Sequence, residues 1–309
     1  MDKINVVFMG TPDFAVPVLE GLIENCNVLG VVSQPDRMVG RKKELVNTPV
    51  KECALNNNIK VFQPLKIRED YSDILALNPD LIVTCAYGQI LPKEILDYPR
   101  LGCINVHASL LPKLRGGAPI HKAIIDGYSK TGVTIMYMDV KMDNGDIISQ
   151  SETEILDSDN LEILFDRLSL MGKELLIKTL PSIIDGSNNR VKQDEELVTY
   201  AYNIKREEEH IDFNKTSREV FNLIRGLCPI PGSGMTIDGN EMKVYNSYIG
   251  TLKGTPGTIS KIYKDGFGVY TKDSEIIITD IKPFGKKRML ASSYLNGIDR
   301  ESFIGKEIK

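Results

Sequence analysis

Unbroken apolar runs alternate with amphipathic segments along the first half of the chain. The runs Ile4–Phe8, Val28–Val32 and Asp80–Ala86 are rich in β-branched residues, which is typical of buried parallel strands. Between the first two runs, apolar residues recur at helical spacing from Phe14 to Glu24. Further helices are predicted at 49–57, 71–77 and 120–126, and further strands at 60–62, 103–107 and 133–138. This alternation predicts an α/β fold with a doubly wound, mostly parallel sheet.

The second half of the chain follows a different pattern. A long amphipathic helix is predicted at Asn160–Ile184, and the polar segment Asp185–Lys192 follows it. Thr216 and Glu219 form a capping-box pattern for a helix at 218–227. Short strands separated by turn residues are predicted at 242–247, 258–263, 267–271 and 275–281, which favours a small β-barrel. We therefore expect a first domain at 1–189, a linker at 190–206 and a second domain at 207–309.

Composition is that of an ordinary globular protein. The 309 residues are 42% apolar, and the five cysteines lack CxxC spacing, so buried free thiols and a reducing cytoplasm are expected. The N-terminus shows no basic and apolar leader, and no apolar run reaches the length of a membrane span. The net charge of −4 argues against a generally basic nucleic-acid-binding protein. From His210 onward, however, 15 Lys and Arg oppose 11 Asp and Glu, so the C-terminal part is cationic.

Candidate chemistry gathers at the ends of two predicted strands. Residues alternate faces along the strand at 103–107, so Asn105 and His107 point the same way at its C-terminal end. The strand at 133–138 leads to Asp139 and Asp143 in a turn-like segment. Open α/β sheets bind ligands at such strand ends. An amide and a protonated imidazole can donate hydrogen bonds to an oxyanion, while a carboxylate orients the imidazole and accepts a proton.

A long segment, Ser33–Thr48, carries four basic side chains: Arg37, Arg41, Lys42 and Lys43. It is longer than most connections in compact domains. A solvated charged loop would have a similar composition. The length, the central glycine and the clustered charge favour a functional loop instead.

The residues around the predicted reaction site resemble a known family. The motif N-V-H-A-S-L-L-P-x-x-R-G-x-A-P-I begins at Asn105, and D-x-x-x-D-x-G-D begins at Asp139. Together they closely resemble the formyltransferases that use 10-formyltetrahydrofolate. The N-terminal F-M-G-T-P-D-F-A, the loop S-Q-P-D-R-x-x-G-R-K-K and the C-terminal extension narrow the resemblance to the members that formylate methionyl-tRNA.

This resemblance implies both a fold and a reaction. The implied fold is a Rossmann-like formyltransferase domain followed by an OB-like barrel that binds tRNA. The implied reaction transfers the formyl group of 10-formyltetrahydrofolate to the free α-amino group of initiator methionyl-tRNA, for translation initiation. No metal is required, and a cytoplasmic monomer is expected.

The resemblance also implies which residues form the sites. Asn105 and His107 would bind the formyl oxygen, and Asp143 would hold the imidazole and help to move the amine proton. Folate is expected to contact Tyr87, Gly88, Ile90, Ser109, Leu110, Leu111, Pro112 and Asp139. The tRNA is expected to contact Arg37, Arg41, Lys42, Lys43, Lys286, Lys287 and Arg288.

Other functions fit parts of the pattern. A sugar-amine formyltransferase or a formyltetrahydrofolate hydrolase would share Asn105, His107 and Asp143, although the basic loop and the C-terminal barrel disfavour both. A non-catalytic RNA-binding relative is disfavoured by the complete set of three polar residues. Dinucleotide binding is not expected, because only Gly10 follows the first strand in place of G-x-G-x-x-G.

Overall fold

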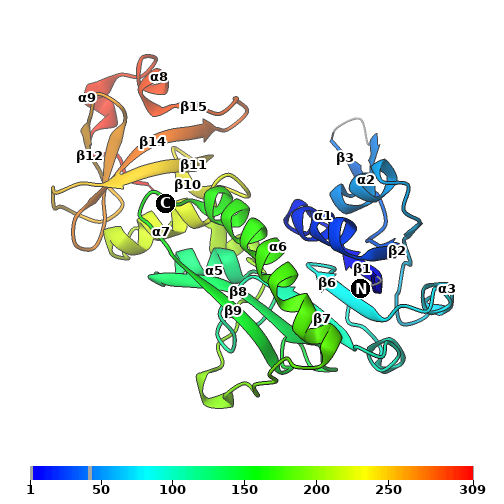
Figure 1. The fold of residues 1–309 in the computed structure, drawn as a ribbon. Helices are drawn as coiled ribbons and strands as arrows, with labels where there is room; N and C mark the ends of the chain where they lie inside the picture. The colour runs from blue at the N-terminus through cyan, green and yellow to red at the C-terminus, as the bar shows by residue number, and fades with distance from the viewer. Residues whose placement is uncertain (1–2, 41–43, 309) are drawn as a thin grey trace. The chain divides into compact units, whose positions relative to one another are not determined.

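The computed structural model describes residues 3–40 and 44–308, which form two compact units (Figure 1). Unit 1 comprises residues up to Pro119 together with Lys130–Glu154 and Phe165–Tyr202. Unit 2 comprises Ile120–Ser129, Ile155–Leu164 and the residues from Asn203 onward. The described residues contain no helix that is long and apolar enough to cross a membrane.

Unit 1 is built on one mixed sheet with the strand order β5-β2-β1-β6-β7-β8-β9. The first five strands in this order pair in parallel, and β8 and β9 add two antiparallel pairings at one edge. The bounds are β1 (Asn5–Gly10), β2 (Asn27–Val32), β5 (Val61–Phe62), β6 (Leu81–Cys85), β7 (Cys103–His107), β8 (Lys130–Tyr137) and β9 (Ile147–Glu154). The predicted doubly wound, mostly parallel sheet is confirmed.

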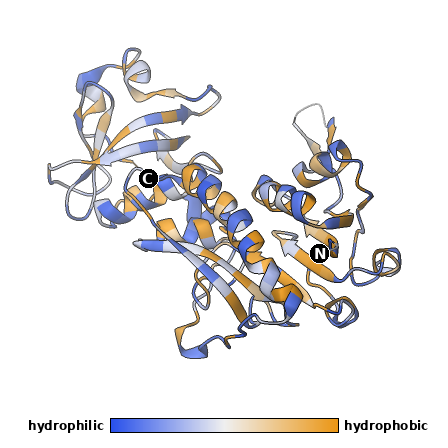
Figure 2. Cartoon of the chain, in the orientation of Figure 1, coloured by the Kyte–Doolittle hydropathy of each residue, from blue (hydrophilic) through white to orange (hydrophobic). Residues whose placement is uncertain are grey.

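Helices cover both faces of this sheet, because its central strands are apolar on both sides. Figure 2 shows β1 and β6 in the orange of hydrophobic residues. One face contributes Val7, Ile82 and Cys103 to a buried cluster that also includes residues of α3 and α4. On the other face α6 approaches β7 closely, since a Cβ added at Gly172 would lie 3.0 Å from Val106. The helices of unit 1 are α1 (Val16–Asn25), α2 (Pro49–Asn56), α3 (Ser72–Leu75), α4 (Lys93–Leu96) and most of α6 (Leu161–Asp185).

Unit 2 contains an antiparallel sheet with the order β10-β11-β14-β13-β12, and β15 pairs with β14. Ile308 forms an isolated bridge to Ile237 of β10, and Glu307 forms one to Thr258 beside β12. Residues 307–308 therefore link the two edges of the sheet, as closure of a small barrel requires. The bounds are β10 (Ser233–Ile237), β11 (Asn240–Ile249), β12 (Ile259–Ile262), β13 (Phe267–Tyr270), β14 (Glu275–Pro283) and β15 (Met289–Leu290).

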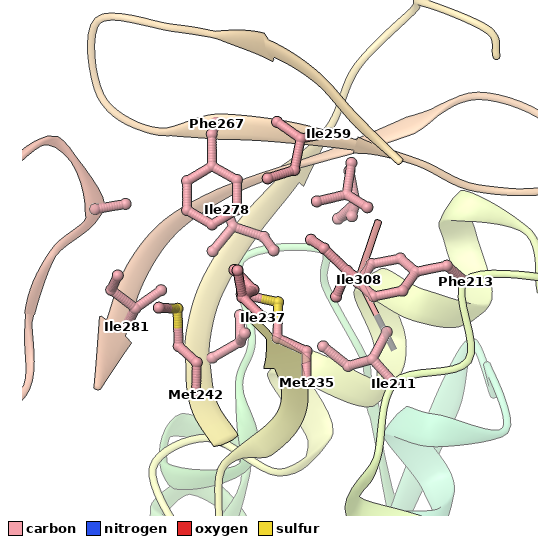
Figure 3. Packing of buried hydrophobic residues seen from close by; sticks show 14 of the residues in the cluster. Ile211, Phe213, Met235, Ile237, Met242, Ile259, Phe267, Ile278, Ile281 and Ile308 are labelled. Atoms are coloured by element: carbon pink, nitrogen blue, oxygen red, sulfur yellow. The ribbon is translucent and has the colours of Figure 1, made fainter. Parts of the chain in front are cut away.

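The interior of unit 2 is a continuous apolar cluster (Figure 3). Phe267, Met235 and Val244 are fully buried there, and the ring of Phe303 meets Phe267 edge to face at 5.2 Å. Helix α7 (Ser217–Gly226) packs against β11 and begins with the predicted capping box of Thr216 and Glu219. The remaining helices are α8 (Ala291–Leu295), α9 (Arg300–Phe303) and nearly all of α5 (Pro119–Ile125).

Several elements differ from the sequence-based expectations. The segment Ser33–Thr48 is not a plain loop, because it contains the hairpin of β3 (Arg37–Val39) and β4 (Glu44–Val46). Strands β9, β10 and β15 and helices α4, α8 and α9 were not predicted; most are short, and β9 carries polar residues on its exposed face. The segment from 190 to 202, part of the predicted linker, belongs to unit 1. All five cysteines are free thiols, as predicted.

Candidate active site

Strand β7 ends at the carboxyl edge of the parallel part of the sheet and positions the first two candidate residues. Asn105 lies on it between Ile104 and Val106, whose side chains are buried on the opposite face. The Thr84 hydroxyl of neighbouring β6 donates to Asn105 Oδ1 at 2.7 Å. No group in the described part of the chain accepts a hydrogen bond from Asn105 Nδ2. The amide is therefore held by its oxygen, and its two N–H groups stay available to a ligand.

His107 occupies the last position of β7 and is only 6% exposed. Its Nε2 lies 3.1 Å from the backbone oxygen of Leu114. Because a carbonyl oxygen only accepts, Nε2 must carry a proton, and in the neutral ring Nδ1 is then the basic nitrogen. Nδ1 faces Asp143 Oδ1 at 3.7 Å, which is within ion-pair reach but too long for a hydrogen bond. The structure thus brings together the predicted His107 and Asp143.

Asp143 is oriented by segments distant from it in the sequence. Its Oδ2 accepts a 2.8 Å hydrogen bond from the backbone N–H of Gly116. Gln193 Nε2 donates to the backbone oxygens of Asp143 and Gly145, each at 2.8 Å. Gly116 has φ +125°, and a Cβ there would lie 2.6 Å from the Ala201 oxygen, so only glycine fits this crossing. The carboxylate position therefore depends on the fold around it.

Backbone strain collects around these three residues. Ala86, Leu114 and Asp143 have φ values of +49°, +62° and +51°. Alanine and leucine seldom adopt this left-handed region, whereas aspartate does so more readily, and strained residues cluster at functional sites. Ala86 follows β6, Leu114 supplies the carbonyl that binds His107, and Asp143 is itself a site residue. The strain indicates that the surrounding packing fixes this geometry.

Arg115 was not predicted as a site residue, yet its buried guanidinium braces the site. It is 3% exposed and donates at 3.0 Å to Gln193 Oε1, Asn144 Oδ1 and Glu195 Oε1. Gln193 in turn holds the backbone of Asp143. In the sequence, Arg115 could have been identified as a site residue from its place in the motif that starts at Asn105. Its partners lie up to 80 residues away, so local pattern could not reveal them.

The segment after β6 holds three of the residues predicted to contact folate. Tyr87 is 4% exposed, and burial raises the pKa of its phenol to about 12. Its Oη is buried and has no hydrogen-bond partner among residues 3–40 and 44–308. Gly88 has φ +89°, and Ile90 is 64% exposed. The backbone of this turn is fixed, because Tyr87 O accepts from Thr11 and from Gln34.

The loop after β7 is held by hydrogen bonds within the loop and to the neighbouring strands. The Ser109 hydroxyl donates to Lys113 O at 2.6 Å, and Ser109 O accepts from Thr134. The N–H of Leu111 donates to Thr134 Oγ1, and its oxygen accepts from Gln150. Leu111 is buried, Leu110 is half-buried, and the bond to Pro112 is cis. Asp139 accepts hydrogen bonds from Val140 N–H and from Asn144, so it shapes the loop that carries Asp143.

The residues predicted to contact tRNA divide into two groups. Arg37 is exposed on β3, while Arg41, Lys42 and Lys43 lie outside the described residues. In unit 2, Lys286 and Lys287 are exposed in the turn between β14 and β15. Arg288 instead makes a bidentate contact with Asp280, with its shortest N–O distance at 2.6 Å, and stacks 4.3 Å from the centre of the Tyr245 ring. Much of its charge is therefore neutralised within unit 2.

A strand-end amide, an imidazole and a carboxylate on this fold agree with the motifs noted in the sequence, and comparison with known families gives the same class. Residues 2–180 match the family model described as formyl transferase, and residues 203–299 match that described as formyl transferase, C-terminal domain. The chain belongs to the formyl transferase family, as its sequence motifs predicted.

Relatives narrow the comparison further. The methionyl-tRNA formyltransferase of Bacillus cytotoxicus is 56% identical over 96% of this chain and 97% of its own length. That of Bacillus thuringiensis subsp. konkukian is 55% identical with the same coverage. Among solved structures, the N-formyltransferase of Helicobacter canadensis in complex with folinic acid and dTDP-3-aminofucose superimposes with a TM-score of 0.66. It is 22% identical over 94% of this chain and all of its own, so it supports the fold alone.

Proposed function

We propose that this protein is a methionyl-tRNA formyltransferase, which transfers the formyl group of 10-formyltetrahydrofolate to the α-amino group of initiator methionyl-tRNA. The observation that carries the proposal is the identity of 55–56% with enzymes of that name over nearly the full length of both chains. The complete set of Asn105, His107 and Asp143 at one strand end supports catalysis over mere binding. The N-formyltransferase of Helicobacter canadensis, which would represent the sugar-amine alternative, is only 22% identical and supports the fold alone.

Asn105 and His107 stabilise the negative charge that develops on the formyl oxygen when the amine attacks. Asn105 is preset for this role, because Thr84 occupies its oxygen and leaves Nδ2 as donor. His107 lies on the same face of β7, and the positive charge that its ring gains on taking up the amine proton adds to this stabilisation. Donors that are fixed before the reaction need no rearrangement during it, and one such donor is worth about 10²–10³ in rate.

Asp143 governs the proton that the attacking amine must lose. Its Oδ1 faces the basic nitrogen of His107, so the pair can take up a proton and return it to the leaving nitrogen of the donor. The new bond joins the amine nitrogen to the formyl carbon, while the bond from that carbon to the donor nitrogen breaks. One proton moves from the first nitrogen to the second, so charge and atoms balance.

We assign folate binding to the residues that follow β6 and β7. 10-Formyltetrahydrofolate supplies the formyl group when it is bound. Tyr87 anchors this turn in the apolar cluster of unit 1, and Gly88 lets the backbone approach a ligand closely. Ile90 offers exposed apolar surface, while Ser109, Leu110, Leu111 and Pro112 form the braced wall and Asp139 shapes the adjoining loop.

We assign tRNA binding to basic residues in both units: Arg37, Arg41, Lys42 and Lys43 in the first, and Lys286, Lys287 and Arg288 in the second. Lys286 and Lys287 are the better phosphate contacts, because Asp280 already pairs Arg288. Each lost phosphate contact should lower the salt dependence of binding by about one unit of slope.

We further propose that residues 1–189 and 207–309 act as catalytic and tRNA-binding domains joined by 190–206, of which 190–202 pack with unit 1, in a cytoplasmic monomer. The excess of Lys and Arg over Asp and Glu from His210 onward supports the assignment of tRNA binding to the C-terminal part. A chain ending near Asn203 should bind folate but lose tRNA affinity, and equilibrium sedimentation of the full chain should give one copy.

The deciding experiment supplies the purified protein with 10-formyltetrahydrofolate and one of three acceptors: charged initiator tRNA, a dTDP-linked amino sugar, or water. Formyl transfer to methionyl-tRNA alone, undiminished by a metal chelator, is the expected result. Preferential formylation of the sugar, or folate hydrolysis without transfer, would replace this proposal with one of the alternatives.

A further inference from the structure

Two tyrosines near the end of unit 1 form an exposed stacked pair. The rings of Tyr200 and Tyr202 lie 5.6 Å apart with an angle of 5° between their planes. Their side chains are 51% and 62% exposed. Large aromatic rings that pack on each other in solvent leave their outer faces uncovered. Such faces are the surface that proteins use to stack unpaired nucleobases.

The pair is fixed to the loop that orients the catalytic aspartate. Ala201, which is fully buried between the two tyrosines, donates its N–H to Arg115 O at 2.7 Å. Arg115 N–H donates to Thr199 O at 2.9 Å, and Tyr200 forms a parallel bridge with Arg115. Residues alternate sides along an extended segment, so Tyr200 and Tyr202 both face outward while Ala201 faces inward.

The same loop leads directly to the reaction site. Gly116, the next residue after Arg115, donates its N–H to the Asp143 carboxylate at 2.8 Å. Tyr200 pairs with Arg115, and the next residue, Gly116, binds Asp143. Ordinary spacings between paired strands and between consecutive Cα atoms therefore place the Tyr200 backbone about 10 Å from Gly116. In an aminoacyl-tRNA, only the α-carbon, the ester and one ribose separate the reacting amine from the terminal base. A base held at the tyrosine pair would keep that amine within reach of the site.

Charge near the pair favours a base over a phosphate. Exposed Asp194, Glu195 and Glu196 precede the tyrosines in the same segment, and only Glu195 among them pairs with Arg115. Carboxylates repel phosphate groups but tolerate the neutral face of a base. The surface therefore fits the uncharged part of the nucleotide.

We propose that Tyr200 and Tyr202 stack the nucleobase of the 3′-terminal nucleotide of the tRNA and thereby position the ester-linked amino acid at Asn105, His107 and Asp143. This proposal rests on the proposed function and adds the residues that hold the reactive end of the acceptor. It concerns binding and positioning, and it assigns neither tyrosine a role in proton transfer.

Its test compares tRNA binding with and without the terminal nucleotide. The parent protein, Tyr200→Ala and Tyr202→Ala are titrated with uncharged initiator tRNA and with the same tRNA lacking its last nucleotide. Removing the nucleotide should weaken binding to the parent by about tenfold and change binding to either alanine variant by much less, since the stack is already lost. Tyr200→Phe and Tyr202→Phe should behave like the parent, because phenylalanine keeps the ring.

Tyr98→Ala is the matched control, because Tyr98 is an exposed tyrosine of the same unit that is 44% exposed. It should retain the tenfold ratio, and thermal unfolding should confirm that every variant folds. An alanine variant that keeps the parent's ratio overturns the proposal, even when the parent formylates methionyl-tRNA. A parent that binds neither tRNA overturns it together with the proposed function.

Discussion

Two carboxylates, half-buried Asp143 in unit 1 and buried Glu275 in unit 2, are held in contrasting ways. Glu275 is fully buried and accepts hydrogen bonds from Ser260, from the Tyr263 phenol at 2.6 Å and from Leu252 N–H at 3.2 Å. Both of its oxygens are therefore satisfied by the barrel. Asp143 has one oxygen bound by Gly116 N–H, while the other faces His107 Nδ1 at 3.7 Å without a hydrogen bond.

The contrast separates a structural carboxylate from a reactive one. A fully satisfied buried group stabilises the fold and has no capacity left for a ligand. An incompletely satisfied group beside a strained backbone and an open amide can tighten its contacts when substrate binds. Burial alone therefore does not identify a reaction site, whereas unused hydrogen-bonding capacity does.

The largest expected effect comes from Asp143→Asn. The amide can still accept from Gly116 but would present N–H groups or a neutral oxygen to His107 Nδ1, so the imidazole loses its anionic partner. Turnover should fall by about 10⁴-fold, as it does when other carboxylates that orient a histidine are neutralised. Steady-state formylation measures this, and melting should stay near that of the parent.

Asp146→Asn is the control for Asp143→Asn. Asp146 lies in the same loop and, among the described residues, its side chain pairs with exposed Arg190 alone, at 3.0 Å, so its loss should change turnover by a few-fold at most. Equal losses in the two variants would mean that the loop as a whole, rather than Asp143, determines the rate.

Glu275→Ala should lower stability, whereas Asp143→Asn should lower turnover. It leaves the Ser260 and Tyr263 hydroxyls and the Leu252 N–H without their acceptor. The free energy of unfolding should fall by about 3 kcal/mol, because three donors lose their shared acceptor. Denaturant unfolding measures the loss, and exposed Glu301→Ala should remain within about 0.5 kcal/mol of the parent. A larger loss of stability in Asp143→Asn than in Glu275→Ala would reverse the comparison.

Arg115→Gln tests whether the position of the Asp143 carboxylate depends on the hydrogen bonds of the Arg115 guanidinium. The variant cannot bind Gln193, Asn144 and Glu195 together, so the backbone of Asp143 loses its brace. Hydrogen bonds to a charged group are worth about 1.5–3 kcal/mol, which predicts a drop of roughly 10- to 100-fold in kcat. Arg115→Lys should fail to rescue, since a point charge cannot reach three acceptors. A loss confined to KM for tRNA would instead place Arg115 in substrate binding.

The smallest effect is a pH dependence in unit 2. Burial, followed by the hydrogen bond to Glu275, raises the pKa of Tyr263. A folded-state pKa above the unfolded value of about 10 contributes stability that is complete below pH 10 and is lost as pH rises beyond it. Tyr263→Phe should therefore cost about 1 kcal/mol at neutral pH and flatten the decline in stability at high pH. If the stability of Tyr263→Phe falls at high pH as steeply as that of the parent, groups other than Tyr263 cause the fall.

The sequence predicted most of the sheet in unit 1 and the residues of β7, because apolar runs and alternation are local signals. It also placed Asn105, His107 and Asp143 at one edge. It could not predict that Leu114 O accepts a hydrogen bond from His107 Nε2 or that Gly116 N–H donates to Asp143, since these contacts depend on the path of irregular loops.

The remaining differences have similar physical causes. Strand β9 is the last strand in the order of the sheet, and its outward residues are polar, so no apolar run marks it. The closure of the barrel by residues 307–308 joins positions far apart in the chain. Arg115 reaches Glu195 across 80 residues, and no local spacing encodes that distance.

The central claim is that the preset amide of Asn105 stabilises the transferring formyl group, and single-turnover formylation of methionyl-tRNA tests it most directly. With both substrates saturating, Asn105→Ala should slow transfer by about 10²–10³-fold. Thr84→Val should slow it less, because the amide remains but loses the hydroxyl that fixes its oxygen. Transfer by Asn105→Ala within threefold of the parent, with folate and tRNA bound normally, would contradict the account.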